Sequence, residues 1–550
     1  MKKRFMMLGI LILSLLMVAC GGKKEASTGK DTEQVLVFNL GAEPKTVDPQ
    51  LNSATDGGIV INNTFEGLMR MNNEGMPVPA TAESYEVSED GKVYTFHIRE
   101  GAKWSDGQPV KAGDFEYAWK RALDPAVASE YSFQLYYIQG AQEYFEGNAS
   151  ADDVAVKSID DKTLEVTLVG PTPYFLALTT FYTYMPVRED VVTQKPEGWA
   201  KDTTIAVSNG PFVISEYSPS DKIILLPNEN YWNRENVKLD KIIFEEIVDN
   251  TTALTAYENG ELDILRDGEV PQQDIPRLQL EDPTFSIAPF LGTYYYIFNV
   301  DKEPTDDVNV RKALTYAIDR KAITEQVAKG GQLPATGFVP NGLFDSEGRD
   351  FRATAGDFDI SVTADIEKAK EYLAKAGYPN GEGFPKLTVV YNTSEGHKAI
   401  AEAVQEMWKK NLGIDVELMN QEWAVFQDTR HVGNFEIARA GWIGDYADPM
   451  TFLDLWTSYS GNNDAQWKWT TNEKKFASNK KYDALIEKSK VTQGTERDAL
   501  LYEAEKILMD EMITMPIYYY TGPMMVQEYV KGWERDILGT WYFGNAEMVK

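Results

Sequence analysis

The feature that most constrains how this chain folds is an apolar leader that ends at its one cysteine. Basic residues 2–4 precede an apolar run of about fourteen residues, 6–19, which Cys20 closes. This layout is that of a secretory signal peptide, and the run is shorter than the roughly 20 residues of a transmembrane helix. We therefore expect residues 1–20 to direct the body out of the cytoplasm. Because no cysteine follows Cys20, that body has to fold without disulfides.

The residues around the cysteine indicate a lipid anchor. Met17-Val18-Ala19-Cys20 resembles the lipobox of bacterial lipoproteins, with Met17 where leucine is usual. The resemblance implies a diacylglycerol on the Cys20 thiol and a protein held on the extracytoplasmic side of the cell membrane. The alternative is a small apolar cysteine that happens to end the run. Residues 21–33 are polar and have no apolar period, which is typical of a flexible tether.

Length and charge limit what the body can be. A chain of 550 residues exceeds one hydrophobic core and is expected to form two or three domains. Its 54 basic and 85 acidic residues give a net charge of −31, which argues against nucleic-acid binding and favours cationic ligands. Aromatic residues make up 12% of the chain, so the body is globular rather than a disordered acidic polymer.

Strand and helix patterns alternate along the chain. Apolar residues recur every second position over 92–99 and 163–169, which predicts half-buried strands. They recur at helical spacing over 114–123, where Asp114 is placed to cap the first turn, and again over 310–318.

Residues 387–419 predict a βαβ unit. An apolar run over 387–391 precedes a helical segment from about residue 398 to residue 412, Gly413 is placed as a C-cap, and a strand begins at residue 414. The fold class is therefore α/β with mixed sheets. No internal repeat or low-complexity tract marks the domain boundaries.

A search for catalytic motifs finds none. The chain lacks G-x-S-x-G, H-E-x-x-H and a phosphate-binding loop. His97, His397 and His431 are its only histidines, so a transition-metal site has few possible ligands. His97 is expected on the surface or in packing. We expect no catalytic residue, no metal and no cofactor; carboxylate acid–base catalysis stays open but has no positive support.

Residues 90–123 carry the first family resemblance. A strand leads to Trp104-Ser105-Asp106-Gly107 and then to a helix start with Ala112, Asp114 and Phe115. This pattern is similar to the signature of the peptide- and nickel-binding proteins of ABC importers. Gly107 suits a turn with positive φ, so the pattern is structural and does not choose between peptide, nickel and sugar ligands.

A second resemblance is closer to the oligopeptide-binding branch of that family. It covers residues 291–299, 420–449 and 477–520. It implies a two-lobed clamp of the periplasmic-binding-protein type with an additional third domain. It also implies that the protein is a monomer and not an enzyme. We expect this division: lobe one from residues 34–65, 190–291 and 513–550, the additional domain from 66–189, and lobe two from 292–512.

The resemblance also implies a ligand site. Asp445 would bind the free α-ammonium of a peptide, although an aspartate in this loop could instead be a turn residue. The backbones of 441–443 and 53–55 would pair with the peptide main chain. Core packing is the alternative for Trp423, and ion pairing is the alternative for the arginines. The implied set is Asp445, Gly441, Trp442, Ile443, Ser53, Ala54, Thr55, Tyr131, Trp423, Arg430, Arg439 and His397.

Departures from the family pattern limit what can be carried over. Gly292 and Ile443 stand where enteric members have cysteines, and Ile297 replaces an acidic residue. Ala328, next to Lys329, replaces a lysine that meets the C-terminus of short peptides. We therefore carry over no preference for peptide length.

The resemblance implies that the protein captures oligopeptides and passes them to a membrane permease. We expect ATP to be hydrolysed at the permease and not by this chain. One alternative is a receptor for a peptide pheromone, which would share the fold and Asp445 but bind one dominant ligand. Others are a nickel, haem or sugar binder of the same superfamily, or a hydrolase built on the scaffold.

Overall fold

The computed structural model describes residues 33–550 except 73–75 and 173. The predicted signal peptide, Cys20 and residues 21–32 of the tether lie outside the described residues. Within the described part, no helix is long and apolar enough to cross a membrane.

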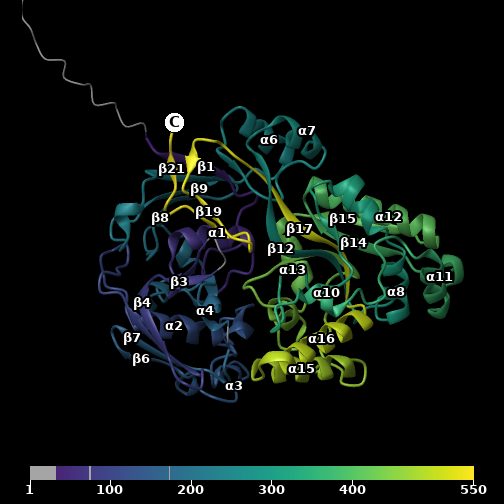
Figure 1. Ribbon diagram of the computed structural model, residues 1–550, viewed down its shortest axis with the longest axis horizontal. Helices are drawn as coiled ribbons and strands as arrows, with labels where there is room; N and C mark the ends of the chain where they lie inside the picture. The colour runs from purple at the N-terminus through teal and green to yellow at the C-terminus, as the bar shows by residue number, and fades with distance from the viewer. Residues whose placement is uncertain (1–32, 73–75, 173) are drawn as a thin grey trace, which may run out of the picture. The chain divides into compact units, whose positions relative to one another are not determined.

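One large mixed sheet runs through the body in the order β15-β14-β16-β12-β17-β11-β1-β10-β9-β8, with β13 beside β17. Its two long strands, β12 and β17, pair with each other over most of their length and link the two ends of the sheet (Figure 1). The strands are β1 (Val35–Asn39), β8 (Phe212–Ser218), β9 (Lys222–Pro227), β10 (Lys241–Glu245), β11 (Ile264–Leu265), β12 (Phe285–Phe298), β13 (Leu333–Pro334), β14 (Leu387–Asn392), β15 (Val416–Gln421), β16 (Ile437–Ile443) and β17 (Thr514–Val526).

The predicted βαβ unit is confirmed. β14 and β15 are parallel, and α12 (Glu395–Leu412) connects them. Gly413 ends the helix in the left-handed conformation, with φ +72°, which glycine adopts without steric cost. The second strand begins two residues later than the sequence predicts.

A separate four-stranded sheet, β4-β5-β7-β6, contains both strands predicted from alternation. Its strands are β4 (Ala82–Val87), β5 (Val93–Ile98), β6 (Val156–Asp160) and β7 (Thr163–Thr167). His97 lies half-buried within β5, as its phase in the strand indicates. Small two-stranded sheets are formed by β2 (Met69–Met71) with β3 (Pro77–Pro79), β18 (Val530–Lys531) with β21 (Glu547–Met548), and β19 (Glu534–Arg535) with β20 (Trp541–Tyr542).

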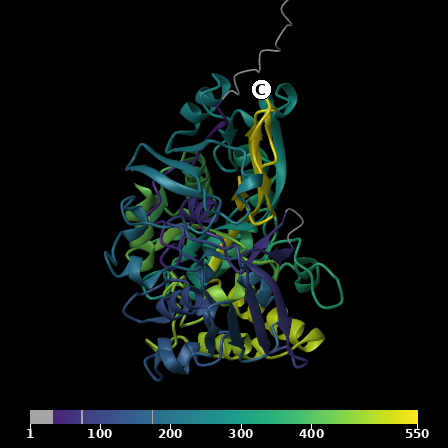
Figure 2. The same ribbon diagram turned by 90° about the vertical axis from the view of Figure 1, so that its left-hand side faces the viewer.

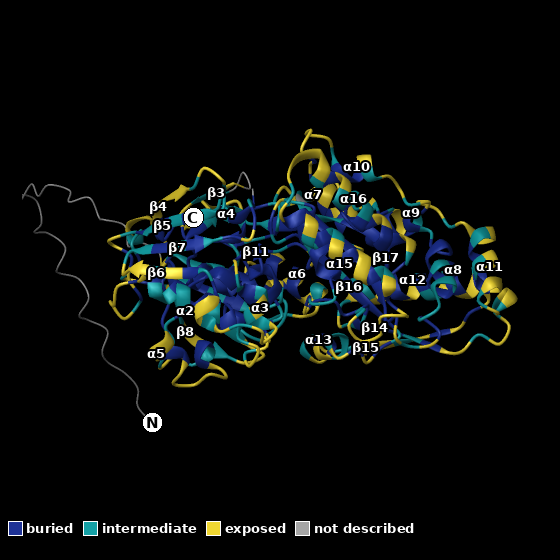
Figure 3. Ribbon diagram, turned by 90° about the horizontal axis from the view of Figure 1, so that it is seen from below, coloured by how far each residue is buried: buried dark blue, intermediate teal, exposed yellow. Residues whose placement is uncertain are grey.

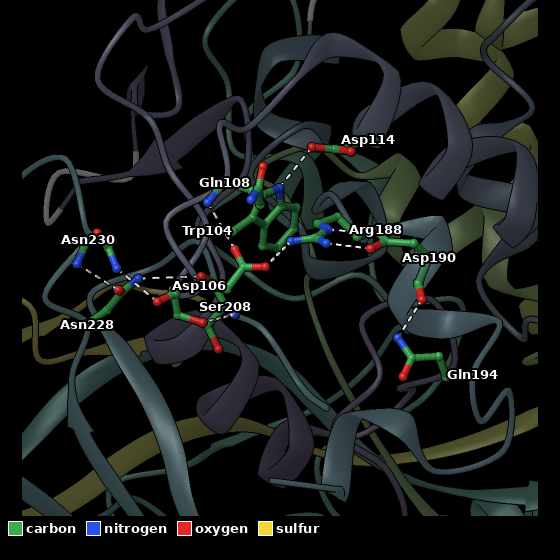
Figure 4. A network of polar contacts seen from close by, with 11 residues as sticks. Trp104, Asp106, Gln108, Asp114, Arg188, Asp190, Gln194, Ser208, Asn228 and Asn230 are labelled. Carbon is green, nitrogen blue, oxygen red and sulfur yellow. Dashed lines mark hydrogen bonds and ion pairs between the residues drawn. The ribbon is translucent and has the colours of Figure 1, made fainter. Parts of the chain in front are cut away.

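The predicted turn around Trp104 has the structural role expected of it (Figure 4). Gly107 has φ +87°, and the Trp104 indole donates a hydrogen bond of 2.9 Å to Asp114. Asp114 also accepts the backbone N–H of Lys111 at 2.9 Å, which caps α2 (Ala112–Leu123). The helix begins at Ala112, two residues before the apolar spacing over 114–123, and Asp114 caps its first turn from the third helical position, as predicted.

The helices cover the sheets with their apolar faces inward. Strands β16 and β17 are buried, whereas α11, α12 and α15 carry exposed residues on their outer sides (Figure 3). The other helices are α1 (Thr55–Thr64), α3 (Ala141–Phe145), α4 (Phe175–Leu178), α5 (Glu189–Val192), α6 (Asn250–Glu258), α7 (Ile275–Glu281), α8 (Val308–Tyr316), α9 (Arg320–Ala322), α10 (Phe351–Ala355), α11 (Ile366–Lys375), α13 (Trp423–His431), α14 (Met450–Leu453), α15 (Ala477–Lys490) and α16 (Gly494–Asp510).

The C-terminal strands return to the beginning of the described chain. The side-chain amide of Gln34 exchanges hydrogen bonds with the backbone of Met548, and the Asn63 amide does so with Trp541 and Phe543. In Figure 1 the yellow C-terminal segment lies beside β1, and in the view turned by 90° it runs up to the C label at the top (Figure 2).

The boundary expected between residues 291 and 292 falls inside a strand. β12 spans 285–298, and its pairing with β17 is irregular between Pro289 and Thr293. The two expected lobes are therefore joined by the continuous strand β12 and share one sheet. The division into lobes remains a proposal.

Candidate functional site

A cavity opens between four parts of the body. Its walls come from the start of α1, from α13, from the end of β16 and from the β19–β20 hairpin. The lining includes Ser53, Ala54, Thr55, Tyr131, Trp423, Arg430, Arg439, Gly441, Trp442, Ile443 and Asp445. Every residue of the sequence-predicted set except His397 is thus brought to one cavity.

One wall is a strand edge. β16 pairs with β12 along its whole length, from Ile437 to Ile443, whereas β14 pairs with it only at Ile437 and Ala438. Among the described residues, no strand pairs with residues 439–443 on the side of β14. Such an edge presents backbone N–H and C=O groups to any extended chain that lies beside it.

Another part of the lining is the extended segment before α1. Ala54 has φ −132° and ψ 152°, and its carbonyl already accepts hydrogen bonds from the Asn52 amide and from the Gly58 N–H. Its N–H contacts the Asn52 side chain at 3.4 Å. Ala54 therefore lines the cavity with its own polar groups engaged, and pairing of the backbone of 53–55 with a peptide stays a prediction.

Asp445 lies just after β16, half-buried in the wall. Its carboxylate accepts hydrogen bonds from the Gln134 amide at 2.6 Å and from the Tyr131 hydroxyl at 3.3 Å. Both donors are neutral, and Asp445 forms no ion pair with any described residue. Burial and the nearby charge of Asp454 raise the pKa of Asp445 well above its usual value, although the two donors lower it. A cation beside Asp445 would remove the cost of ionising it here.

The two predicted arginines differ in their partners. Arg430 forms an ion pair with Asp464, at 3.0 Å, so the ion-pair alternative holds for this residue. Arg439 is only 9% exposed, and within the described chain it meets no carboxylate. Its guanidinium donates to the Tyr520 hydroxyl at 3.0 Å and lies over the Tyr294 ring. Arg439 is therefore the buried cation of this cavity that a ligand anion could neutralise.

Trp423 and His397, two further residues of the predicted set, differ in whether they line the cavity. Trp423 lines the cavity and also stacks on Phe426, with ring centroids 6.2 Å apart, so lining and packing coexist. His397, on α12, is not in the lining. Its Nδ1 lies 3.3 Å from the Tyr294 hydroxyl, and burial together with the Arg439 charge lowers its pKa well below the usual value. A ligand role for His397 stays a prediction.

One position of departure from the family is explained by the strand register. Gly292 lies directly opposite Ile443 in the β12–β16 pair. A Cβ at Gly292 would lie 2.7 Å from Ile443 Cδ1, so the isoleucine fills the space that the glycine leaves. No described group of three or more His, Cys, Asp or Glu side chains could hold a metal ion.

Comparison with known proteins identifies the family. Residues 76–464 match the model of the bacterial extracellular solute-binding proteins, family 5. The chain is 42% identical to the oligopeptide-binding protein OppA of Bacillus subtilis, over 99% of both chains. The chain belongs to this family. Its members are solute-binding proteins of peptide importers, and they bind rather than catalyse.

Solved structures confirm the two-lobed fold with its extra domain. The murein tripeptide binding protein MppA of Escherichia coli is 36% identical, with a TM-score of 0.87 over 94% of this chain and 99% of MppA. Haemophilus influenzae OppA in complex with the peptide RPPGFSPFR is 33% identical, with a TM-score of 0.86 over 94% of this chain and all of that one. An unliganded open form of MppA, aligned over 94% of this chain and 98% of MppA, has a TM-score of only 0.62. The present structure thus resembles the peptide complex far more than the open form.

Several contacts at and beside the cavity were not predicted from the sequence. His431 Nδ1 lies 2.9 Å from Asp464 and its Nε2 lies 3.1 Å from Glu130, so one imidazole bridges two carboxylates. Gln134 supplies the shorter hydrogen bond to Asp445. The His431–Asp464 contact joins residues 33 positions apart, and the Gln134–Asp445 contact joins residues 311 positions apart. No local sequence pattern indicates either contact.

A second end of the cavity was also missed. It lies between α1, β2 and the β19–β20 hairpin. Arg70 there forms a 2.7 Å ion pair with Glu534 and lies over the Tyr542 ring. Glu66, buried beside them, accepts hydrogen bonds from Trp232 and Tyr231. The charges at this end are largely paired within the protein.

Proposed function

We propose that this protein captures peptides that have a free N-terminus and delivers them to the permease of an ABC importer. The observation that carries the proposal is the state of Asp445, a half-buried carboxylate with two neutral hydrogen-bond donors and no cationic partner among the described residues. A peptide α-ammonium supplies the missing cation and a charge-assisted hydrogen bond. Membership of a peptide-importer family supports the same ligand class.

The main chain of the peptide would extend the sheet. Residues 439–443 offer a free strand edge, and residues 53–55 line the same cavity. Backbone pairing of this kind is independent of sequence, because every peptide carries the same N–H and C=O groups. Side chains would then project into the rest of the cavity, where water adapts to them.

Ligand binding would stabilise the closed clamp. The cavity is walled by residues of both expected lobes and of the expected additional domain (66–189), and the Tyr131 and Gln134 contacts to Asp445 join two of these parts. The difference in TM-score between the peptide complex and the open form supports such a motion. A peptide that contacts both sides favours the closed state by its differential affinity.

The protein would work as a monomer tethered to the membrane. We propose lipidation of Cys20 and a flexible segment over residues 21–33, which keep the body on the extracytoplasmic side. Substitution Cys20→Ala should release the protein from the membrane fraction of cells. A variant that stays in that fraction would contradict the anchor.

Calorimetry with a defined pentapeptide and its N-acetylated form tests the proposed function. For the wild type, acetylation should weaken binding by about 2–5 kcal/mol, because Asp445 is then left buried without its cation. In Asp445→Asn the two peptides should bind almost equally. Asp415→Asn, at an exposed site paired with Lys409, is the matched control and should behave as the wild type. Equal affinities of the wild type for both peptides would refute the ammonium site.

A further inference from the structure

Two amide side chains in the cavity wall have unpaired polar atoms. Gln427 is 2% exposed and Asn462 is 8% exposed, and both line the cavity. Gln427 Oε1 and Asn462 Nδ2 have no hydrogen-bond partner within the described chain. Buried polar atoms are nearly always paired, so two unpaired ones in a ligand cavity indicate a partner brought by the ligand.

The position of the two amides follows from their elements. Gln427 lies on α13, one turn from Trp423 and one turn before Arg430 and His431, which also line the cavity. Asn462 stands two residues before Asp464, the carboxylate that pairs with Arg430 and His431. Both amides therefore border the same charged cluster.

The charges beside these amides are already matched. Asp464 is shared by Arg430 and His431, and His431 also meets Glu130. A charged ligand side chain would have to lose its hydration here without finding a free counter-ion. A neutral side chain with both a donor and an acceptor suits the two amides better.

We infer that Gln427 and Asn462 form a side-chain subsite for a carboxamide, the side chain of asparagine or glutamine in the bound peptide. A carboxamide has an N–H donor for Gln427 Oε1 and an oxygen acceptor for Asn462 Nδ2. Because each amide offers both groups, the match does not depend on which way either one is turned. The inference rests on the proposed peptide-binding function and names one class of its ligands.

A scan of peptide positions by calorimetry tests the subsite. The probes are pentaalanine and pentaalanine with glutamine or the similarly shaped methionine at each position in turn. The wild type should prefer glutamine over methionine at one position by at least about tenfold, equal to about 1.4 kcal/mol. A site built to hydrogen-bond its ligand discriminates in this way against an analogue that lacks the polar atoms.

Variants assign the preference to the two amides. In Gln427→Met, and in Asn462→Leu, the preference should fall to about twofold or less. Gln421→Met is the matched control, because Gln421 also has an unpaired Oε1 but lies outside the cavity lining; it should keep the preference. Thermal unfolding of each variant checks that it is folded.

The outcomes are separable. If the wild type binds the glutamine and methionine peptides equally at every position, or if both variants keep the glutamine preference, the subsite is overturned. Binding of pentaalanine would still leave the proposed function intact. A wild type that binds none of these peptides, including pentaalanine, overturns both.

Discussion

His431 is expected to act as a pH-dependent bridge that favours closure over the ligand. Its imidazole contacts Asp464 from the same expected lobe and Glu130 from the expected additional domain. Burial lowers the pKa of His431, but the Asp464 charge and the hydrogen bonds to both carboxylates outweigh it and raise the pKa from 6.5 to about 9. His431 is therefore protonated, and the bridge carries full charge, at neutral pH.

The size of the effect follows from this shift. An increase from 6.5 to about 9 corresponds to roughly 3 kcal/mol of interaction with the protonated form. Asp464 is the larger cause, and we expect it to stay beside His431 when the clamp opens, because both belong to the same expected lobe. Closure would then add only the Glu130 contact, an ion pair of about 1 kcal/mol, which is roughly fivefold in peptide affinity. Lys45, 4.0 Å from Glu130, competes for the same carboxylate and keeps this share small.

The pH dependence has a definite sign. Because the pKa is raised in the closed state, the added affinity is fully present below the pKa of the open state and is lost as the pH rises through about 9. Glu130 and Asp464 have pKa values below their usual ones, since His431 and, for Asp464, Arg430 outweigh the effect of burial. Both carboxylates therefore stay ionised across this range.

Calorimetry of wild type and His431→Gln between pH 6 and pH 10 is the assay. The peptide's own α-amino group titrates in the same range, so the informative quantity is the ratio of the two dissociation constants. That ratio should be about five at pH 7 and should approach one at pH 10. A double-mutant cycle of His431→Gln with Glu130→Gln should give a coupling energy in peptide affinity. The cycle of His431→Gln with Asp464→Asn should give a coupling energy mainly in the free energy of unfolding. A ratio that does not change with pH would show that the His431–Glu130 contact does not favour closure.

Two further predictions concern stability. Arg121 pairs through two nitrogens with the buried Asp48, at 2.7 and 2.8 Å, so Arg121→Met should lower the free energy of unfolding in urea by about 3–5 kcal/mol; a loss below 1 kcal/mol would contradict this. Asp114→Ala removes the cap of α2 and leaves the buried Trp104 indole N–H without its acceptor, so it should cost about 2–4 kcal/mol without changing peptide affinity, because Asp114 lies outside the cavity lining. A large change in affinity would show that the turn around Trp104 is not purely structural.

Local pattern predicts local structure well in this chain. Alternation over 92–99 and 163–169 and helical spacing over 114–123 each correspond to an observed element, and Gly413 ends its helix as predicted. These features depend on residues close together in sequence. Asp114 caps the first turn of α2 as predicted, by accepting the Lys111 N–H, although the helix begins two residues before the apolar spacing does.

Contacts between distant residues could not be predicted in the same way. Gln134 and Asp445 are 311 positions apart, and no pattern in either segment indicates that they meet. The sheet shared by both expected lobes depends on the length of β12 and β17, which sequence alternation does not reveal. The resemblance to a family placed Asp445 in the cavity, but the unpaired state of Gln427 appears only when its burial is known.

The most direct measurement is a crystal structure of the protein with a bound pentapeptide. We expect the peptide's α-amino nitrogen to lie about 2.7–2.9 Å from an Asp445 carboxylate oxygen, with the peptide backbone paired to residues 441–443. An amino end placed elsewhere, with Asp445 still contacting only Tyr131 and Gln134, would contradict it.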